Sequence, residues 1–136
     1  MQSMSRYYAL IVPVLAATLI AGALFALTAS ADSASAPVSA ITSPPQGVAI
    51  PAGFVSYSIK GTATDRSGAG LARVEVTTDD FTWNRATDTS ANGSWSTWTY
   101  RWGFSFAGLY KIKSRAVDKA GNVETPGPGV DVEIIP

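Results

Sequence analysis

The chain begins with one long apolar run and continues with short segments in which apolar and polar residues alternate. Residues 9–27 carry no charge, and Thr18 is their only side-chain hydroxyl. At about 1.5 Å of rise per residue, a helix of this length spans about 28 Å, close to the thickness of a bilayer's hydrocarbon core. The run therefore predicts an N-terminal hydrophobic helix, transmembrane or signal, within residues 1–31. Arg6 before it and Asp32 as the first charge after it predict a cytoplasmic amino terminus and an extracytoplasmic remainder.

Two fates of this helix are open. Its length exceeds the core of about 7 to 15 residues that a secretory signal needs, which favours a retained anchor. Ala29-Ser30-Ala31 has the small-x-small form that signal peptidase cuts, which would release a protein beginning at Asp32. A retained helix could pack closely against others through small residues spaced four apart, although alanine is also common in signal peptides. The candidates for helix packing are Ala17, Ala21, Gly22 and Ala26.

Residues 32–40 are mostly Ser and Ala, with one Asp and one Pro, and show no apolar periodicity. This composition is typical of a flexible linker. Fully stretched, it reaches about 30 Å, so a tethered domain would stay near the membrane.

Residues 41–136 show alternation with a period of two, interrupted about every ten residues by clusters of Gly, Pro, Asn or Asp. In residues 71–77, for example, Val74 and Val76 share one side while Arg73 and Glu75 share the other. No stretch has helical periodicity. The pattern predicts an all-β antiparallel sandwich of about seven strands. Its other inward candidates are Val55, Tyr57, Ile59, Ala72, Trp98, Tyr100, Trp102, Tyr110, Ile112, Ser114, Ala116, Val130, Val132 and Ile134.

Composition narrows the possible functions. The 136 residues include ten basic and ten acidic side chains, so there is no net positive field to attract nucleic acid. The absence of histidine and cysteine removes the commonest general base, thiolate nucleophiles and the usual zinc ligands. We therefore expect a noncatalytic single domain with no cofactor and no nucleic-acid partner.

Several motifs in the β region occur together in a known family. They are Gly61-x-Ala63-x-Asp65, Gly70-Leu71-Ala72-Arg73-Val74-Glu75-Val76-Thr77, Thr82-Trp83, Trp95 with Trp98, Gly108-Leu109-Tyr110, and Arg115-Ala116-x-Asp118-x-Ala120-Gly121-Asn122. Residues 41–135 thereby resemble the bacterial Ig-like domains of exported proteins, and are similar to the Ig-like dimerisation domain of sulfite-oxidase-type molybdenum enzymes. The resemblance implies an Ig-like β-sandwich over residues 41–136. It implies no cofactor, because the cofactor domain of those enzymes is missing here.

One segment departs from that resemblance. Where those families typically have a polar, proline-rich connection after the last tryptophan strand, residues 103–108 contain Phe104 and Phe106. Large apolar side chains in a short loop either cover the open end of the sandwich or are displayed to a partner. Ig-like topology would place this loop at the end opposite the start of the domain. The turns 65–70 and 119–122 would lie at the other end.

Further surface candidates follow from parity. Trp95 has the opposite parity to Trp98 and Trp102, so we expect it on the surface as a possible contact, whereas Trp83 is expected in the core. Exposed tryptophans could stack on sugar rings, which leaves carbohydrate as a less favoured ligand. A basic stripe that could dock an acidic partner is formed by Lys111, Lys113 and Arg115.

Acidic residues offer two weaker possibilities. Asp65 with Ser67, and Asp118 with Asn122, could ligate calcium, but side chains of these types also stabilise their own turns. Asp79 and its neighbour Asp80 would point to opposite faces of an extended segment and could not share a substrate.

Two functions are consistent with these patterns. The first is a noncatalytic, membrane-tethered subunit, anchored in the inner membrane with its domain on the periplasmic side. It would stabilise or link a larger integral-membrane or envelope complex, for example a respiratory or photosynthetic one. The alternative is a secreted or cell-surface module, released by cleavage after Ala31, that contacts carbohydrate or copies of itself.

Overall fold

The computed structural model describes residues 35–53 and 55–136. The chain divides into two units, Met1–Ala34 and Ser35–Pro136. The expected N-terminal helix and its packing candidates, Ala17, Ala21, Gly22 and Ala26, lie outside the described residues. Within the described ranges, no helix is long and apolar enough to cross a bilayer.

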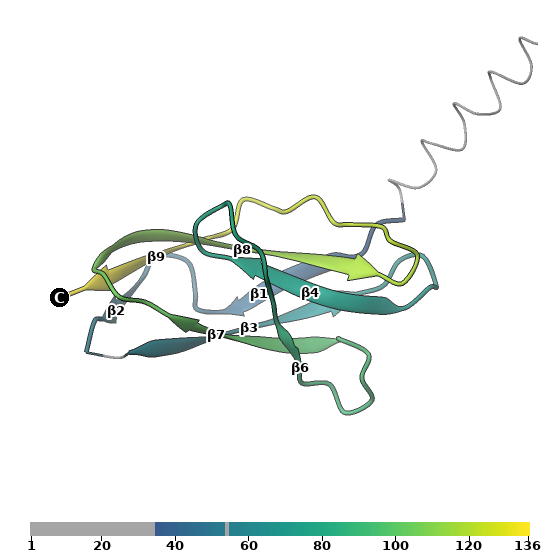
Figure 1. Ribbon diagram of the computed structural model, residues 1–136, viewed down its shortest axis with the longest axis horizontal. Helices are drawn as coiled ribbons and strands as arrows, with labels where there is room; N and C mark the ends of the chain where they lie inside the picture. Colours follow the sequence, from purple (N-terminus) through teal and green to yellow (C-terminus); the bar gives the residue numbers. More distant parts are fainter. Residues whose placement is uncertain (1–34, 54) are drawn as a thin grey trace, which may run out of the picture. The chain divides into compact units, whose positions relative to one another are not determined.

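The second unit consists of two β-sheets packed face to face (Figure 1). One sheet has the order β1-β3-β7-β6, formed by β1 (Val38–Ser43), β3 (Ser56–Thr64), β7 (Thr97–Gly103) and β6 (Thr87–Asp88). The other has the order β2-β9-β8-β4-β5, formed by β2 (Val48–Pro51), β9 (Val130–Ile135), β8 (Gly108–Asp118), β4 (Leu71–Thr77) and β5 (Asn84–Arg85).

This architecture confirms the predicted all-β sandwich. The described residues contain nine strands rather than about seven. The difference lies in short strands at sheet edges, since β5 and β6 have two residues each and β2 has four. Pairing is antiparallel except between β2 and β9, because the chain crosses to the other sheet after β1 and then runs alongside β9.

The first strand begins earlier than expected. Val38 pairs with Thr64 and Ala40 pairs with Thr62, so residues 38–40 belong to β1 and not to the linker predicted for residues 32–40. Small residues can occupy this strand because its outer side chains face solvent and contribute little to the core. Their lack of apolar periodicity therefore concealed a strand held by backbone pairing.

Trp98 occupies the middle of the core between the sheets. Its ring is buried and its Nε1–H donates to the carbonyl of Thr62 at 2.9 Å. Gly61 lies against this ring, and a Cβ at Gly61 would overlap both the indole and the Ala40 carbonyl. The predicted inward parity is confirmed along β8 and β9. The buried apolar residues are Ile50, Ile59, Ala63, Leu71, Val74, Val76, Ala86, Trp95, Trp98, Trp102, Ile112, Ala116, Val117, Val132 and Ile134.

Several predicted orientations were wrong near the ends of strands. Val55, expected inward, precedes β3 and is exposed. Thr77, which the alternation in residues 71–77 places outward with Arg73 and Glu75, is fully buried at the end of β4. Trp83 is half-buried and lies beneath the guanidinium of Arg115 instead of in the core. Side chains alternate strictly only within a regular strand. Near or beyond its end, the position of a residue in the count no longer predicts which way its side chain points.

Candidate functional site

We call the end of the sandwich that contains Val38 and the turns 65–70 and 119–122 the proximal end. The opposite end, which contains the β7–β8 loop and the chain terminus at Pro136, is the distal end (Figure 1). The β7–β8 loop lies opposite the start of the domain, as the sequence predicts.

Polar side chains from two turns meet at the proximal end. Ser67 Oγ lies 3.1 Å from Asp65 Oδ1 and 2.9 Å from Asp118 Oδ2. Asn122 donates its side-chain amide to Asp118 Oδ2 at 2.9 Å, and this contact is the largest cause of the lowered pKa of Asp118. The backbone N–H of Gly70 donates to Asp65 and is the largest cause of that residue's lowered pKa. These donors occupy carboxylate oxygens that calcium would need, so turn stabilisation explains the cluster.

The two adjacent carboxylates after β4 have different partners. Asp79 Oδ1 accepts backbone N–H groups from Thr82 and Phe81, at 2.7 and 2.9 Å. These bonds, that of Thr82 first, lower the pKa of Asp79 from its usual 3.8 to about 2. Asp80 instead pairs with Lys113 at 2.7 Å. The two carboxylates therefore do not converge on a common site.

The basic stripe is present on the outer face of the five-stranded sheet, but its charges are matched. Lys111 lies 2.8 Å from Asp131 on β9, and Lys113 is paired with Asp80 as described above. Arg115 lies 2.8 Å from Glu75 on β4. The docking of an acidic partner on this stripe stays a prediction, since such a partner would have to compete with these carboxylates.

Arg115 also contacts the ring of Trp83, with its guanidinium carbon 4.2 Å from the ring centroid. Glu75 bridges Arg115 and Arg73, whose Nε lies 3.3 Å from it. One face of this indole is thereby covered by a cation. The arrangement leaves that face unable to stack on a sugar ring.

Trp95 was expected on the surface but is buried, with 7% of its area exposed. The parity count assumed an extended chain back from Trp98, whereas β7 begins at Thr97 and Trp95 has a φ of 62°. The backbone N–H of Trp95 donates to Asp88 Oδ2 and Ser90 Oγ, each at 3.2 Å. The left-handed backbone turns the indole inward, so Trp95 is not a displayed contact.

The two loop phenylalanines lie in different environments. Phe104 is half-buried, with its ring 5.1 Å from that of Trp102, and so covers the core. Trp102 also packs edge-on against Tyr110, at 5.0 Å, and the Tyr110 hydroxyl donates to the carbonyl of Phe106 at 2.9 Å. The Phe106 side chain itself is 77% exposed.

The strand lengths explain why aromatic residues gather here. β4 pairs with β8 no further than Lys113, and β6 pairs with β7 no further than Thr99. Among the described residues, no strand therefore pairs with the distal part of β8 or β7 on this side (Figure 1). Trp102, Phe104 and Tyr110 fill the opening. We call these three residues the aromatic plug.

Around the plug, apolar side chains face solvent. Val55, Phe106 and Leu109 are 80%, 77% and 83% exposed, and we call them the distal tip. Val55 precedes β3, whose first residue, Ser56, pairs with Gly103, and Leu109 lies on β8 opposite Glu133. Sequence reasoning identified Phe106 but missed Val55 and Leu109. Period-two alternation would have found Leu109, which has the opposite parity to Tyr110.

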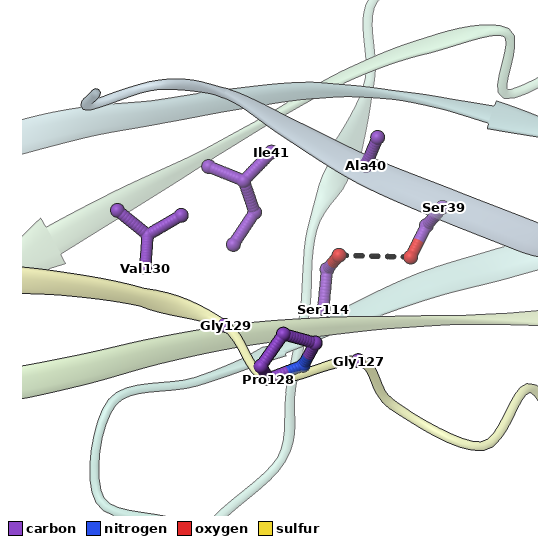
Figure 2. Close-up of a pocket in the computed structure, with 8 residues that line it drawn as sticks. All are labelled: Ser39, Ala40, Ile41, Ser114, Gly127, Pro128, Gly129 and Val130. Carbon is purple, nitrogen blue, oxygen red and sulfur yellow. Dashed lines mark hydrogen bonds between the residues drawn. The ribbon is translucent and has the colours of Figure 1, made fainter. Parts of the chain in front are cut away.

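A separate hollow of about 180 Å³ opens between β1 and the segment 127–130 (Figure 2). At one end the hydroxyls of Ser39 and Ser114 are 2.8 Å apart. The Glu124 carboxylate links β1 to β8, because it accepts hydrogen bonds from the Ser39 N–H, the Ser39 hydroxyl and the Ala116 N–H. Because the hollow is lined by small or apolar residues and two bonded hydroxyls, it offers no evident chemistry.

Comparisons with known proteins extend this description. No protein-family model matches the chain, and no curated protein matches it. Among solved structures, the fibronectin(III)-like modules of Clostridium thermocellum CbhA are 25% identical, with a TM-score of 0.52 over 72% of this chain and 46% of that one. The sulfane dehydrogenase SoxCD of Paracoccus pantotrophus is 23% identical, with a TM-score of 0.50 over 65% of this chain and 23% of that one.

The fold is Ig-like. A third similar structure, the endo-beta-1,4-mannanase of Thermotoga petrophila, is 9% identical, with a TM-score of 0.55 over 73% of this chain. This chain spans 20% of the mannanase and less than half of each of the other two. The sandwich is therefore shared with segments of larger proteins. The resemblance to Ig-like domains is confirmed as a fold, while membership of a sequence family is not established.

Proposed function

We propose that the chain is a noncatalytic, membrane-tethered subunit whose Ig-like domain docks on a larger extracytoplasmic protein assembly through its distal tip. The observation that carries this proposal is the exposure of Val55, Phe106 and Leu109 together at one end. Exposed apolar side chains at one end of a domain are typical of a surface for protein contacts.

The position of the tip supports the proposal. It lies at the end of the sandwich opposite Val38, where β1 begins. On the outer face of the five-stranded sheet, Lys111 and Lys113 are paired with Asp131 and Asp80 within the domain. That face therefore offers less unpaired charge to a partner, which favours the tip as the contact.

The test begins with the native protein, extracted from membranes in a mild detergent. Its intact mass should include residues 1–31, and it should migrate with a stable set of membrane proteins. Phe106→Ser should weaken that association, because the largest apolar side chain of the tip is removed. Phe81→Ser is the matched control, since Phe81 is 87% exposed but lies outside the tip.

A different result would exclude this function. A mass beginning at Asp32, in the soluble fraction and without a stable partner, would contradict membrane tethering. Equal association of the Phe106→Ser and Phe81→Ser variants would contradict docking through the tip.

The alternative, a secreted or cell-surface binding module, has one observation in its favour. A hollow of about 360 Å³ on the outer face of the four-stranded sheet is lined largely by threonine hydroxyls and Lys60, which could bond to sugar hydroxyls. Binding of a released protein to polysaccharide, weakened by Thr62→Val with Thr97→Val, would favour this alternative. The threonines in the hollow are Thr42, Thr62, Thr89, Thr97 and Thr99.

A further inference from the structure

We propose that the docking partner adds an extended strand to the free outer edge of β7 at Arg101–Gly103, with an acidic side chain beside Arg101. This inference rests on the proposed function and specifies the chemistry of the partner. Strand addition supplies affinity through backbone hydrogen bonds and specificity through alternate side chains.

The direction of the backbone groups on β7 follows from its pairing with β6. Thr89 N–H donates to the Thr97 carbonyl at 3.0 Å, and Thr87 is the pairing partner of Thr99. In an antiparallel ladder the groups of alternate residues point to the same side. The N–H and C=O groups of Arg101 and Gly103 therefore point away from β3, towards the side that β6 occupies further along.

That side is free at the distal end. β6 begins at Thr87, and the preceding residue, Ala86, already donates its N–H to Val74 in the other sheet at 2.8 Å. Within residues 35–53 and 55–136, no strand pairs with Arg101 or Gly103 on this side. Backbone groups left open on a sheet edge are a template for an added strand.

Positive charge on the outer face of β3 and β7 indicates the chemistry of the added strand. Arg101 is exposed, and its Nε donates to Ser56 Oγ at 3.1 Å. No carboxylate in the described part of the chain forms an ion pair with Arg101 or with Lys60, which lies on the same outer face. An acidic residue on the added strand would complement this face.

The edge is continuous with the distal tip. Gly103 ends β7, and the loop that follows carries Phe104 in the plug and Phe106 in the tip. A strand running along β7 towards the loop would bring apolar side chains to Phe106. A second copy of this chain is a poorer occupant, because two antiparallel β7 edges would place Arg101 near its symmetry mate.

The test uses the full chain in detergent micelles and a synthetic probe, a peptide in which valine and glutamate alternate. We expect the peptide to bind and to slow hydrogen exchange at the amides of Arg101 and Gly103. The same peptide with N-methylated backbone amides should not bind, because it cannot form the ladder. Arg101→Glu should weaken binding about fivefold to tenfold, and a valine–lysine peptide should restore it.

Each other outcome overturns the proposed partner strand. Equal binding of the N-methylated peptide would mean that side chains alone make the contact. The amides of Arg101 and Gly103 could instead exchange slowly without peptide, and more slowly still as the protein concentration rises. That result would identify a second copy as the occupant. An absence of peptide binding would reject this partner chemistry while leaving the effect of Phe106→Ser on the native assembly as an independent test of the proposed function.

Discussion

The proximal and distal ends of the sandwich close the same kind of opening by different means. At the proximal end, Ser67 and Asn122 donate hydrogen bonds to carboxylates, and the turns carry their own polar partners. At the distal end, strands stop short, the aromatic plug fills the gap, and Phe106 is left in solvent. The difference indicates that the proximal end serves the fold, whereas the distal end has surface that the fold does not use.

The largest loss of stability is expected when the aromatic plug at the distal end is disrupted. Trp102→Ala deletes a ring that is 4% exposed and contacts both Phe104 and Tyr110. We expect a loss of about 3 to 5 kcal/mol in the free energy of unfolding, measured by chemical denaturation, because a large aromatic leaves a cavity. A loss below about 1 kcal/mol would show that the distal end is not held by this packing.

A smaller effect is expected at the proximal end. Asp118 accepts donors from Ser67, Ala120 and Asn122, and Asp118→Asn replaces one acceptor oxygen by a donor. The variant should be less stable than the parent at neutral pH. Because the pKa of Asp118 is lowered in the folded state, its stabilisation is present above the usual value of 3.8 and is lost as the pH falls below it.

Denaturation of the parent and Asp118→Asn proteins at neutral and acidic pH measures this effect. The two stability curves should converge as the pH falls, since protonation of Asp118, like the substitution by Asn, replaces one acceptor oxygen by a donor. Curves that remain parallel through the acidic range would contradict the assigned role of this carboxylate.

The sequence predicted the regular strands of the sandwich better than the packing at its distal end. Alternation within a strand identified the inward sides of β8 and β9, including Ile112 and Val132, because side chains there follow the pleat without interruption. The departure from the Ig-like family pattern indicated that Phe104 and Phe106 were unusual. It could not assign one to the plug and the other to the tip, since that division depends on where β4 and β6 end.

The sequence failed where the backbone leaves the regular strand conformation. Trp95 was placed outward because a residue count cannot reveal a left-handed φ at a tryptophan, where such a conformation is rare. The basic stripe was found, but the carboxylates of Glu75 and Asp131 come from neighbouring strands, so the pairing depends on sheet order and register. Local patterns specify which side of a strand is buried, but they leave contacts between strands undetermined.

The loop after β4 provides a more local test of pH dependence. The pKa of Asp79 is lowered to about 2 by N–H groups of Thr82 and Phe81, so its contribution to stability is present above 3.8 and is lost between that value and about 2. Asp79→Asn should flatten the acid limb of the stability curve by a small amount, because the group is exposed. Asp80→Asn is the matched control, because it changes the adjacent carboxylate, which pairs with Lys113, and leaves the N–H bonds of Thr82 and Phe81 to Asp79 in place.

The smallest expected effect on stability is the sharpest test of the comparison. Val55→Ser, Phe106→Ser and Leu109→Ser should each change the free energy of unfolding by no more than about 0.5 kcal/mol, because these side chains are already in solvent. The same substitutions should weaken the native assembly if the tip is a contact surface, whereas Phe81→Ser should not. If Phe106→Ser destabilised the domain as strongly as Trp102→Ala, the plug and the tip would be one structural unit, and exposure at the distal end would no longer indicate a partner.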